Sequence, residues 1–167
     1  MRLCIILASL LLSTQAYAAT ADSAILALDR PQYTRHIEEV DRRESLCLAL
    51  NLYHEVRGST LKDIHAVAWV TKNRVTKSKH KSYCKIIWES GQYTWTIKPV
   101  KSLIPKETKS WDRMVRVARQ VINGDIADPT NGANTFYISR LGIPSWTEKG
   151  TGRMVIGAHT FVKLPKR

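Results

Sequence analysis

The 167-residue sequence has no internal repeat, no low-complexity segment and no apolar run long enough to span a membrane comfortably. It also lacks a recognisable nucleic-acid-binding motif and a recognisable spacing of metal-binding histidines. A chain of this length without a repeat predicts one domain built around a single hydrophobic core.

The most apolar segment lies at the N-terminus and is typical of a secretory signal. Arg2 precedes an almost unbroken apolar run from Leu3 to Leu12, and Ala16-Tyr17-Ala18 has the small-x-small pattern that signal peptidase cleaves. We therefore expect residues 1–18 to be a signal peptide and the mature chain to begin near Ala19. The expected location is the bacterial periplasm or cell envelope; the alternative is an uncleaved segment that tethers the protein to the membrane.

Acidic residues are scarce. Fourteen Asp and Glu stand against 26 Lys and Arg, which gives a net charge of +12, or +11 without Arg2. Such a surface attracts polyanions. Nucleic acid is not expected as a partner, because the chain is predicted to be exported and carries no nucleic-acid motif. We expect anionic envelope polymers or lipid instead; charge that serves only solubility is the alternative.

Only three cysteines are present, and Cys4 falls in the predicted signal peptide. The remaining two, Cys47 and Cys84, predict a disulfide, since an even number of cysteines in an exported protein is typical of disulfide pairing. Closure of that loop would stabilise the fold by about 3–4 kcal/mol. Two buried free thiols are the alternative. A Cys-His peptidase is not favoured, because neither cysteine carries a signature of that kind.

Apolar spacing predicts helices in the first half of the mature chain. Residues 19–43 show no clear apolar period and are expected to form a poorly structured lead-in. A helix is predicted from Glu44 to a stop at Gly58, because glycine is common just after a helix end. A second helix follows, in which Thr60 and Asp63 form a weak capping box.

The later part of the chain combines one more helix with β-like segments. The helix covers residues 111–122, with Ser110 as its N-cap and Gly124 after its end. Residues 134–139 and 154–162 are rich in β-branched and aromatic residues, so they predict strands. The predicted fold class is therefore α+β, with helices first and a small antiparallel sheet near the C-terminus.

His54 and Glu55 begin like the helical zinc motif His-Glu-x-x-His, but Gly58 stands where the second histidine belongs, so no metal is expected. Burial on an apolar helix disfavours the charged carboxylate, which raises the pKa of a glutamic acid. An ordinary glutamic acid is protonated in about one molecule in 500 at pH 7, so a general acid needs this shift. The alternative is an ion pair of Glu55 with Arg57 or Lys62 on a solvated helix end.

Several short motifs follow one another between Cys47 and Phe161. They are Leu50-Asn51-Leu52-Tyr53-His54-Glu55-Val56-Arg57-Gly58, Ala66-Val67-Ala68-Trp69-Val70 with Asn73-Arg74-Val75, Gln92-Tyr93-Thr94-Trp95, Gly132-Ala133-Asn134-Thr135-Phe136-Tyr137, Trp146, and Ile156-Gly157-Ala158-His159-Thr160-Phe161. The ordered set resembles the SleB-type cell wall hydrolases, a family that includes spore-cortex-lytic enzymes and relatives encoded by bacteria and phages. The chain departs from the family pattern at Val56, where alanine is usual, and at Phe136, where relatives can carry histidine.

The resemblance implies a lysozyme-like fold over residues 44–167 that acts on the glycan strands of peptidoglycan, with Glu55 as the catalytic acid. Its best-studied members resemble lytic transglycosylases, in which one carboxyl protonates the leaving oxygen and then accepts the proton of the muramic acid C6 hydroxyl. This chemistry implies no cofactor and no metal. We expect a monomer whose partner is peptidoglycan, encoded by a bacterium or, as an endolysin, by a phage.

The resemblance also implies substrate-binding or supporting roles for six further residues, although each also fits an ordinary core or surface position. These are Gln92, Tyr93, Thr94, Tyr137, Trp146 and His159. Arg57, Asn73 and Arg74 are expected to anchor the loop beside the catalytic helix rather than to touch substrate.

Other activities remain open at the level of the sequence. A muramidase-type hydrolase would need a second carboxylate, for which Asp63 and Glu89 are the nearest candidates. An N-acetylmuramoyl-L-alanine amidase or a peptidase would need zinc ligands. A non-catalytic envelope-binding module would need only the positive charge.

Overall fold

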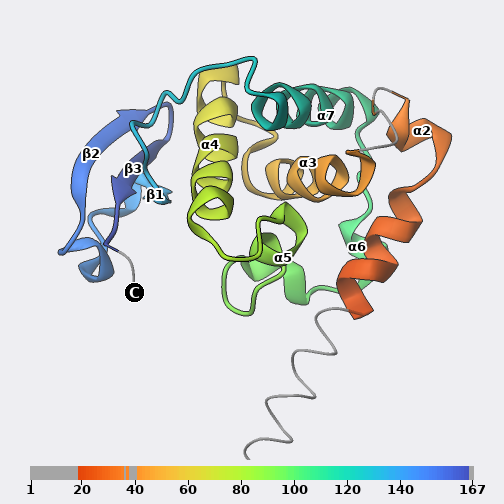
Figure 1. The fold of residues 1–167 in the computed structure, drawn as a ribbon, viewed down its shortest axis with the longest axis horizontal. Coiled ribbons are helices and arrows are strands. Elements are labelled where there is room, and N and C mark those ends of the chain that lie inside the picture. Colours follow the sequence, from red (N-terminus) through yellow and green to blue (C-terminus); the bar gives the residue numbers. More distant parts are fainter. Residues whose placement is uncertain (1–18, 36, 38–40, 166–167) are drawn as a thin grey trace, which may run out of the picture.

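The computed structural model describes residues 19–35, 37 and 41–165, so the predicted signal peptide at residues 1–18 lies outside the described part. The described chain forms a helical body with a three-stranded antiparallel sheet beside it (Figure 1). This arrangement confirms the predicted α+β class, mainly helical with a small sheet near the C-terminus. Among the described residues, no helix is both long and apolar enough to cross a membrane.

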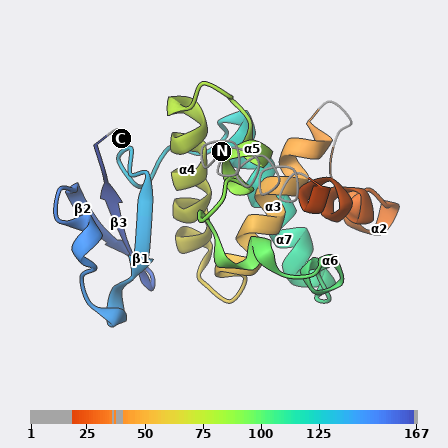
Figure 2. The same cartoon turned by 90° about the horizontal axis from the view of Figure 1, so that it is seen from below.

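The helical body is built around α3, which packs against α4, α5 and α7 (Figure 2). Residues 46–53 of α3 are all buried, because a helix enclosed by other helices keeps no solvated face. The helix therefore forms as predicted and ends just before Gly58. The helices are α2 (Pro31–Thr34), α3 (Arg42–Val56), α4 (Leu61–Lys77), α5 (Tyr83–Ile87), α6 (Val100–Leu103) and α7 (Thr108–Asn123), with 3₁₀ turns at Thr94–Ile97, Ser139–Leu141 and Ser145–Thr147.

Helix α7 differs from the prediction at its start and agrees with it at its end. It begins at Thr108, so Ser110 lies inside the helix and is not the N-cap. The N-cap position is Glu107, and the Ser110 hydroxyl donates a hydrogen bond to the Glu107 carboxylate at 3.0 Å. Gly124 forms the C-cap in the left-handed region, with φ of 83°, as its position after the last apolar residue predicts.

The sheet has the order β1-β3-β2, with β3 in the centre. Its strands are β1 (Thr135–Ile138), β2 (Thr151–Ile156) and β3 (His159–Lys163), and both pairings are antiparallel. The β-rich run predicted at residues 154–162 is therefore two strands joined by a tight turn. Gly157 permits that turn, because its φ of 58° lies in the left-handed region.

The structure differs from the expected poorly structured lead-in, because residues 19–28 are helical and pack on the body. Ala21, Ala24, Ile25 and Leu28 are buried. Their spacing of three, four and seven residues is that of an amphipathic helix, and alanine and leucine both favour helix. The apolar period was therefore present in the sequence, but two of its four positions are small alanines that weaken the pattern.

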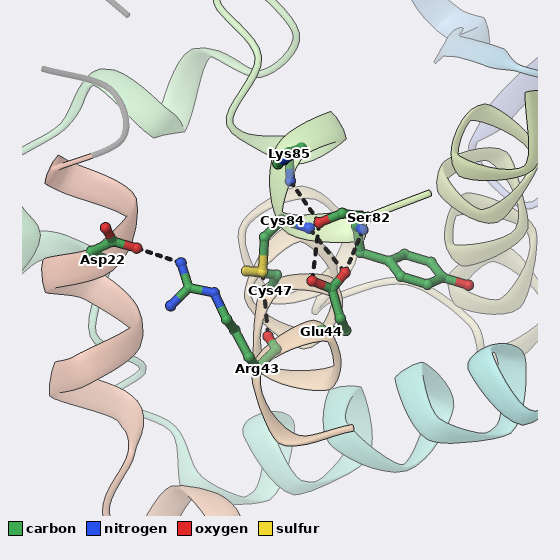
Figure 3. The surroundings of a disulfide bond; sticks show 8 residues. Asp22, Arg43, Glu44, Cys47, Ser82, Cys84 and Lys85 are labelled. Carbon is green, nitrogen blue, oxygen red and sulfur yellow. Dashed lines mark hydrogen bonds and ion pairs between the residues drawn. A yellow bond between two sulfur atoms is a disulfide. The ribbon is translucent and has the colours of Figure 1, made fainter. Parts of the chain in front are cut away.

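The predicted disulfide joins Cys47 of α3 to Cys84 of α5 (Figure 3). Glu44, one turn earlier on α3, strengthens the same junction: its carboxylate accepts hydrogen bonds from the Ser82 hydroxyl at 3.0 Å and from the backbone N–H groups of Tyr83 and Cys84. These N–H groups lie at the start of α5, where helical N–H groups have no intrahelical partner and favour a negative charge. The disulfide and Glu44 together hold α5 against the catalytic helix predicted from the sequence.

Candidate active site

A groove with a volume of about 780 Å³ runs between the helical body and the sheet. One wall is formed by α3 and α4, another by the segment that follows α5, and a third by β1 and the loop after it. Glu55 lies in this groove. The residues that line it are Glu55, Arg74, Lys77, Ile86, Glu89, Ser90, Gly91, Gln92, Tyr93, Asn134, Thr135, Phe136, Trp146, Leu164 and Pro165.

Glu55 lies in the last turn of α3 and is half-buried. Burial raises the pKa of its carboxyl above the ordinary value, while electrostatic interactions with His159 and Arg74 lower it by a smaller amount. The alternative ion pair with Arg57 is not formed, because the Arg57 guanidinium contacts Glu107 at 3.4 Å. The environment of Glu55 is therefore that of a carboxyl that holds its proton at higher pH than an exposed glutamic acid does.

His159 lies at the start of β3, where Asp63 of α4 holds it. Its Nδ1 atom lies 2.9 Å and 3.0 Å from the two carboxylate oxygens of Asp63, and both side chains are buried. The Ala158 N–H also donates to Asp63, at 3.3 Å. A Cβ atom on Gly157 would lie 2.7 Å from the Asp63 carboxyl carbon, so only glycine fits there without a shift. The β2–β3 turn is therefore fastened to the first turn of α4, within electrostatic reach of Glu55.

The sequence interpretation of Asp63 was only partly right. The Thr60 hydroxyl accepts a hydrogen bond from the Asp63 backbone N–H at 3.3 Å, as a capping residue does. The Asp63 carboxylate, however, is directed to His159 rather than back to Thr60. A carboxylate in the first turn of a helix also fits ordinary capping, and no local signal in the sequence distinguishes the two uses.

Arg74 of α4 joins the other two walls of the groove. Its Nε atom donates to the Asn134 carbonyl at 2.6 Å, and its Nη1 atom donates to the Gln92 side chain at 3.1 Å and to the Tyr93 hydroxyl at 3.2 Å. The Tyr93 hydroxyl lies 3.3 Å from the Thr71 hydroxyl, also on α4. One guanidinium therefore holds the segment after α5 and the start of β1 in place, which agrees with the anchoring role predicted for Arg74.

A chain of buried polar groups continues from there beneath the groove. The Trp95 indole N–H donates to Asn51 at 3.2 Å, and the Asn51 amide lies 3.4 Å from the Thr71 hydroxyl. His54 stacks on Trp95 with ring centroids 4.8 Å apart, and its Nε2 atom lies 3.0 Å from the Leu103 carbonyl. Burial lowers the pKa of His54. This histidine is therefore engaged in packing beneath the site.

Asn73 anchors the loop that leads into β1. Its amide donates to the Asp128 carboxylate and to the Ala133 carbonyl, both at 2.9 Å. Asp128 also accepts hydrogen bonds from the Thr130 N–H and hydroxyl at 2.8 and 2.6 Å and from the Gly132 N–H at 2.8 Å. Burial raises the pKa of Asp128, but these hydrogen bonds outweigh it and leave the pKa below the ordinary value. The loop is thus ordered around one ionised carboxylate.

The structure brings several of the predicted site residues together with Glu55. Gln92, Tyr93 and Trp146 line the same groove. Thr94 is exposed at the start of a 3₁₀ turn and is not part of the lining, and Tyr137 packs its ring edge-on against Trp146, with centroids 6.3 Å apart. Phe136, where relatives can carry histidine, also lines the groove. Its ring is edge-on to that of His159 at 5.3 Å.

Within the described residues, no three His, Cys, Asp or Glu side chains are grouped as a metal site would require. The groove instead offers one half-buried carboxyl, a cationic side chain beside it and a second carboxyl, Glu89, which is exposed. An open groove of this size suits a site that works by proton transfer on an extended substrate.

The fold and the groove thus define a class: an α+β protein with a half-buried acid in a long open groove. A sequence model of the Cell Wall Hydrolase family matches residues 58–162, more than half of the chain, and the chain belongs to this family. Membership makes peptidoglycan the substrate, hydrolysis of the cell wall the activity, and the cell envelope or the outside of the cell the place of action. No curated protein and no solved structure gave a significant match.

Proposed function

We propose that the protein cleaves the glycan strands of peptidoglycan as a SleB-type lytic transglycosylase, with Glu55 as the general acid and then the general base. The observation that carries this proposal is the position of Glu55, half-buried in a groove of about 780 Å³ and with a raised pKa. A raised pKa increases the fraction of Glu55 that carries a proton at a given pH, which favours the role of an acid that protonates a glycosidic oxygen.

The proposed reaction needs only one carboxyl. Glu55 donates its proton to the glycosidic oxygen as the bond from that oxygen to the C1 atom of muramic acid breaks. The C6 hydroxyl of the same sugar then attacks C1, and the Glu55 carboxylate accepts the hydroxyl proton. The products are a 1,6-anhydro sugar and a strand with a free hydroxyl, and Glu55 is again protonated. Neither water nor a second carboxylate takes part.

The charges around Glu55 suit both halves of this cycle. Burial favours the protonated form that begins the reaction, whereas electrostatic interactions with His159 and Arg74 favour the carboxylate that exists between the two proton transfers. Because Asp63 holds His159 and three groups hold Arg74, both side chains are kept in place before substrate arrives.

A hydrolase with a second carboxylate is the second candidate, and Glu89 is the observation that favours it. Glu89 lines the groove and is exposed, so it is accessible to a water molecule beside the substrate. Asp63, the other candidate from the sequence, is committed to His159 and Ala158. We therefore assign any hydrolytic second carboxylate to Glu89.

Mass spectrometry of products from purified peptidoglycan tests both candidates. The protein, Glu55→Gln and Glu89→Gln are compared under the same conditions. Anhydromuropeptides from the unchanged protein and Glu89→Gln, but not from Glu55→Gln, are expected. Reducing sugar ends that disappear in Glu89→Gln would establish the hydrolase. Free peptides with intact glycan would establish an amidase, and equal results for all three proteins would mean that the groove is a binding site only.

We further propose that residues 1–18 are removed on export and that the folded unit of the mature chain begins at residue 19 and acts as a monomer. The helix at residues 19–28, which packs on the body, supports this start point. Intact mass and sedimentation velocity of the protein recovered from the periplasm or culture medium test both statements; retention of the full mass would mean that the segment is kept as a tether.

A further inference from the structure

Exposed apolar side chains are concentrated in one part of the fold. Among the described residues, eight large apolar side chains are exposed, and five of them lie between residues 138 and 155. Leu141 and Ile143 are 70% and 71% exposed, in the connection between β1 and β2. Isolated exposed apolar residues are ordinary on a protein surface, but a group of them marks a surface that binds something.

The register of the sheet relates two more members of this group, Val155 and Trp146, to one face of the sheet. Tyr137, Thr160 and Val155 are direct neighbours across β1, β3 and β2, so their side chains share one face of the sheet. The Trp146 ring packs against Tyr137 at one side of this row. We call Leu141, Ile143, Trp146 and Val155 the sheet tip. The sheet lies at the opposite end of the molecule from α2 (Figure 1).

Cationic side chains lie in the same segment of the chain as the sheet tip. Arg140, Lys149 and Arg153 are exposed within the same segment, against a single acidic residue, Glu148, so the segment carries a net charge of +2. The Arg153 guanidinium is held beside Trp146 by the Thr147 carbonyl and hydroxyl, at 2.7 and 3.0 Å. Exposed apolar and cationic side chains in one segment match the two layers of an anionic bilayer surface, acyl chains beneath charged headgroups.

We propose that the sheet tip docks the protein on the surface of an anionic lipid bilayer. Leu141 and Ile143 enter the boundary between headgroups and acyl chains, and Trp146 lies at headgroup level. Arg140 and Lys149 contact lipid phosphates.

Other occupants fit the surface less well. Glycan strands carry hydroxyl and amide groups and offer no apolar phase for Leu141 or Ile143. A second copy of the chain, related by a two-fold axis, would bring one face of charge +2 against another. A lipid surface accommodates the apolar and the cationic side chains together.

Docking would also orient the catalytic groove. Trp146 belongs both to the sheet tip and to the groove lining, so the groove opens beside the docked surface. The glycan strands of peptidoglycan that lie nearest the membrane would then be within reach of the groove. The docking inference does not rest on the proposed reaction, because lipid binding needs no chemistry at Glu55.

Vesicle co-sedimentation tests the proposal with the mature chain. Vesicles of phosphatidylcholine with phosphatidylglycerol are compared with vesicles of phosphatidylcholine alone. The double variant Leu141→Ser/Ile143→Ser is expected to bind the anionic vesicles about tenfold more weakly than the unchanged protein. Ile97→Ser is the matched control, since Ile97 is 70% exposed outside the sheet tip, and it should bind as the unchanged protein does. Arg140→Ser/Lys149→Ser should lose about fivefold in affinity for each charge.

Each other outcome would overturn the proposal. Equal vesicle binding by the Leu141→Ser/Ile143→Ser variant, or no vesicle binding by the unchanged protein, would show that the sheet tip does not recognise lipid. A dimer that the variant abolishes would make the tip a contact between copies. Slower digestion of lipid-free peptidoglycan by the variant would make it part of the wall-binding surface; digestion at the unchanged rate is expected. Because the vesicle assay measures no catalysis, its result stands even if the proposed reaction fails.

Discussion

Replacement of Asp63 by alanine would test the junction between α4 and the sheet. The Asp63 carboxylate is the buried acceptor for His159 Nδ1, at 2.9 and 3.0 Å, and for the Ala158 N–H, and the His159 and Asp63 side chains are only 7% and 1% exposed. Removal of one partner from a buried pair costs about 3–5 kcal/mol, because the remaining polar groups are left buried without an acceptor. For a domain of this size, such a loss lowers the Tm by roughly 6–20 °C.

Thermal unfolding at pH 7, followed by circular dichroism, measures the effect. Asp125→Ala is the control, because Asp125 is exposed and a change there should alter stability by no more than about 0.5 kcal/mol. Asp63→Asn retains an acceptor for one hydrogen bond, so its Tm should lie between those of Asp63→Ala and Asp125→Ala. Peptidoglycan digestion below the Tm should also be slower for Asp63→Ala, since His159 loses its fixed position near Glu55. A Tm of Asp63→Ala within about 2 °C of the Asp125→Ala value would refute the reasoning.

Three further changes have effects with a defined sign. Glu55→Gln should raise the Tm at pH 7 and less so at pH 4, because a raised pKa in the folded state means that ionisation favours unfolding at high pH; a uniform gain would contradict this. Asp128→Asn should lower the Tm at pH 7, because the lowered pKa of Asp128 means that its ionised form stabilises the fold. The difference in Tm between the two proteins should narrow as the pH falls below the ordinary aspartate pKa of 3.8 towards the lower pKa of the folded state. A Tm difference that does not change with pH would contradict this prediction. Cys47→Ser with Cys84→Ser should cost about 4 kcal/mol in urea unfolding, given the 37-residue separation. A loss of unfolding free energy well below this value would mean that Glu44 alone holds α5 in place.

Much of the helical body could be predicted from the sequence because helices depend on residues close to one another in the chain. The apolar residues of α3 and the glycine after it predict both the helix and the place where it ends. The helix at residues 19–28 was overlooked although its apolar spacing is present, because alanine contributes little to a hydrophobic pattern. The start of α7 was misplaced, since Ser110 fits a cap by residue type but lies within the helix.

The site was predictable only where its residues are close in sequence or match a family motif. Glu55 was identified from its helix and its motif, and Gln92, Tyr93 and Trp146 from the motifs alone; the structure places all four in one groove. The commitment of Asp63 to His159 was not predicted. These residues are 96 positions apart, and each has an ordinary local interpretation, the one as a helix cap and the other as a core histidine.

The helical body, the family and the residue that carries the proposed acid could be predicted from the amino-acid sequence, because apolar period, turn residues and ordered motifs are local properties of the chain. The surroundings of that acid depend on how the chain folds. The pKa of Glu55 depends on burial and on charges from α4 and β3, and the sheet tip depends on which side chains the antiparallel register leaves exposed. Those are consequences of packing between distant segments, which no window of the sequence contains.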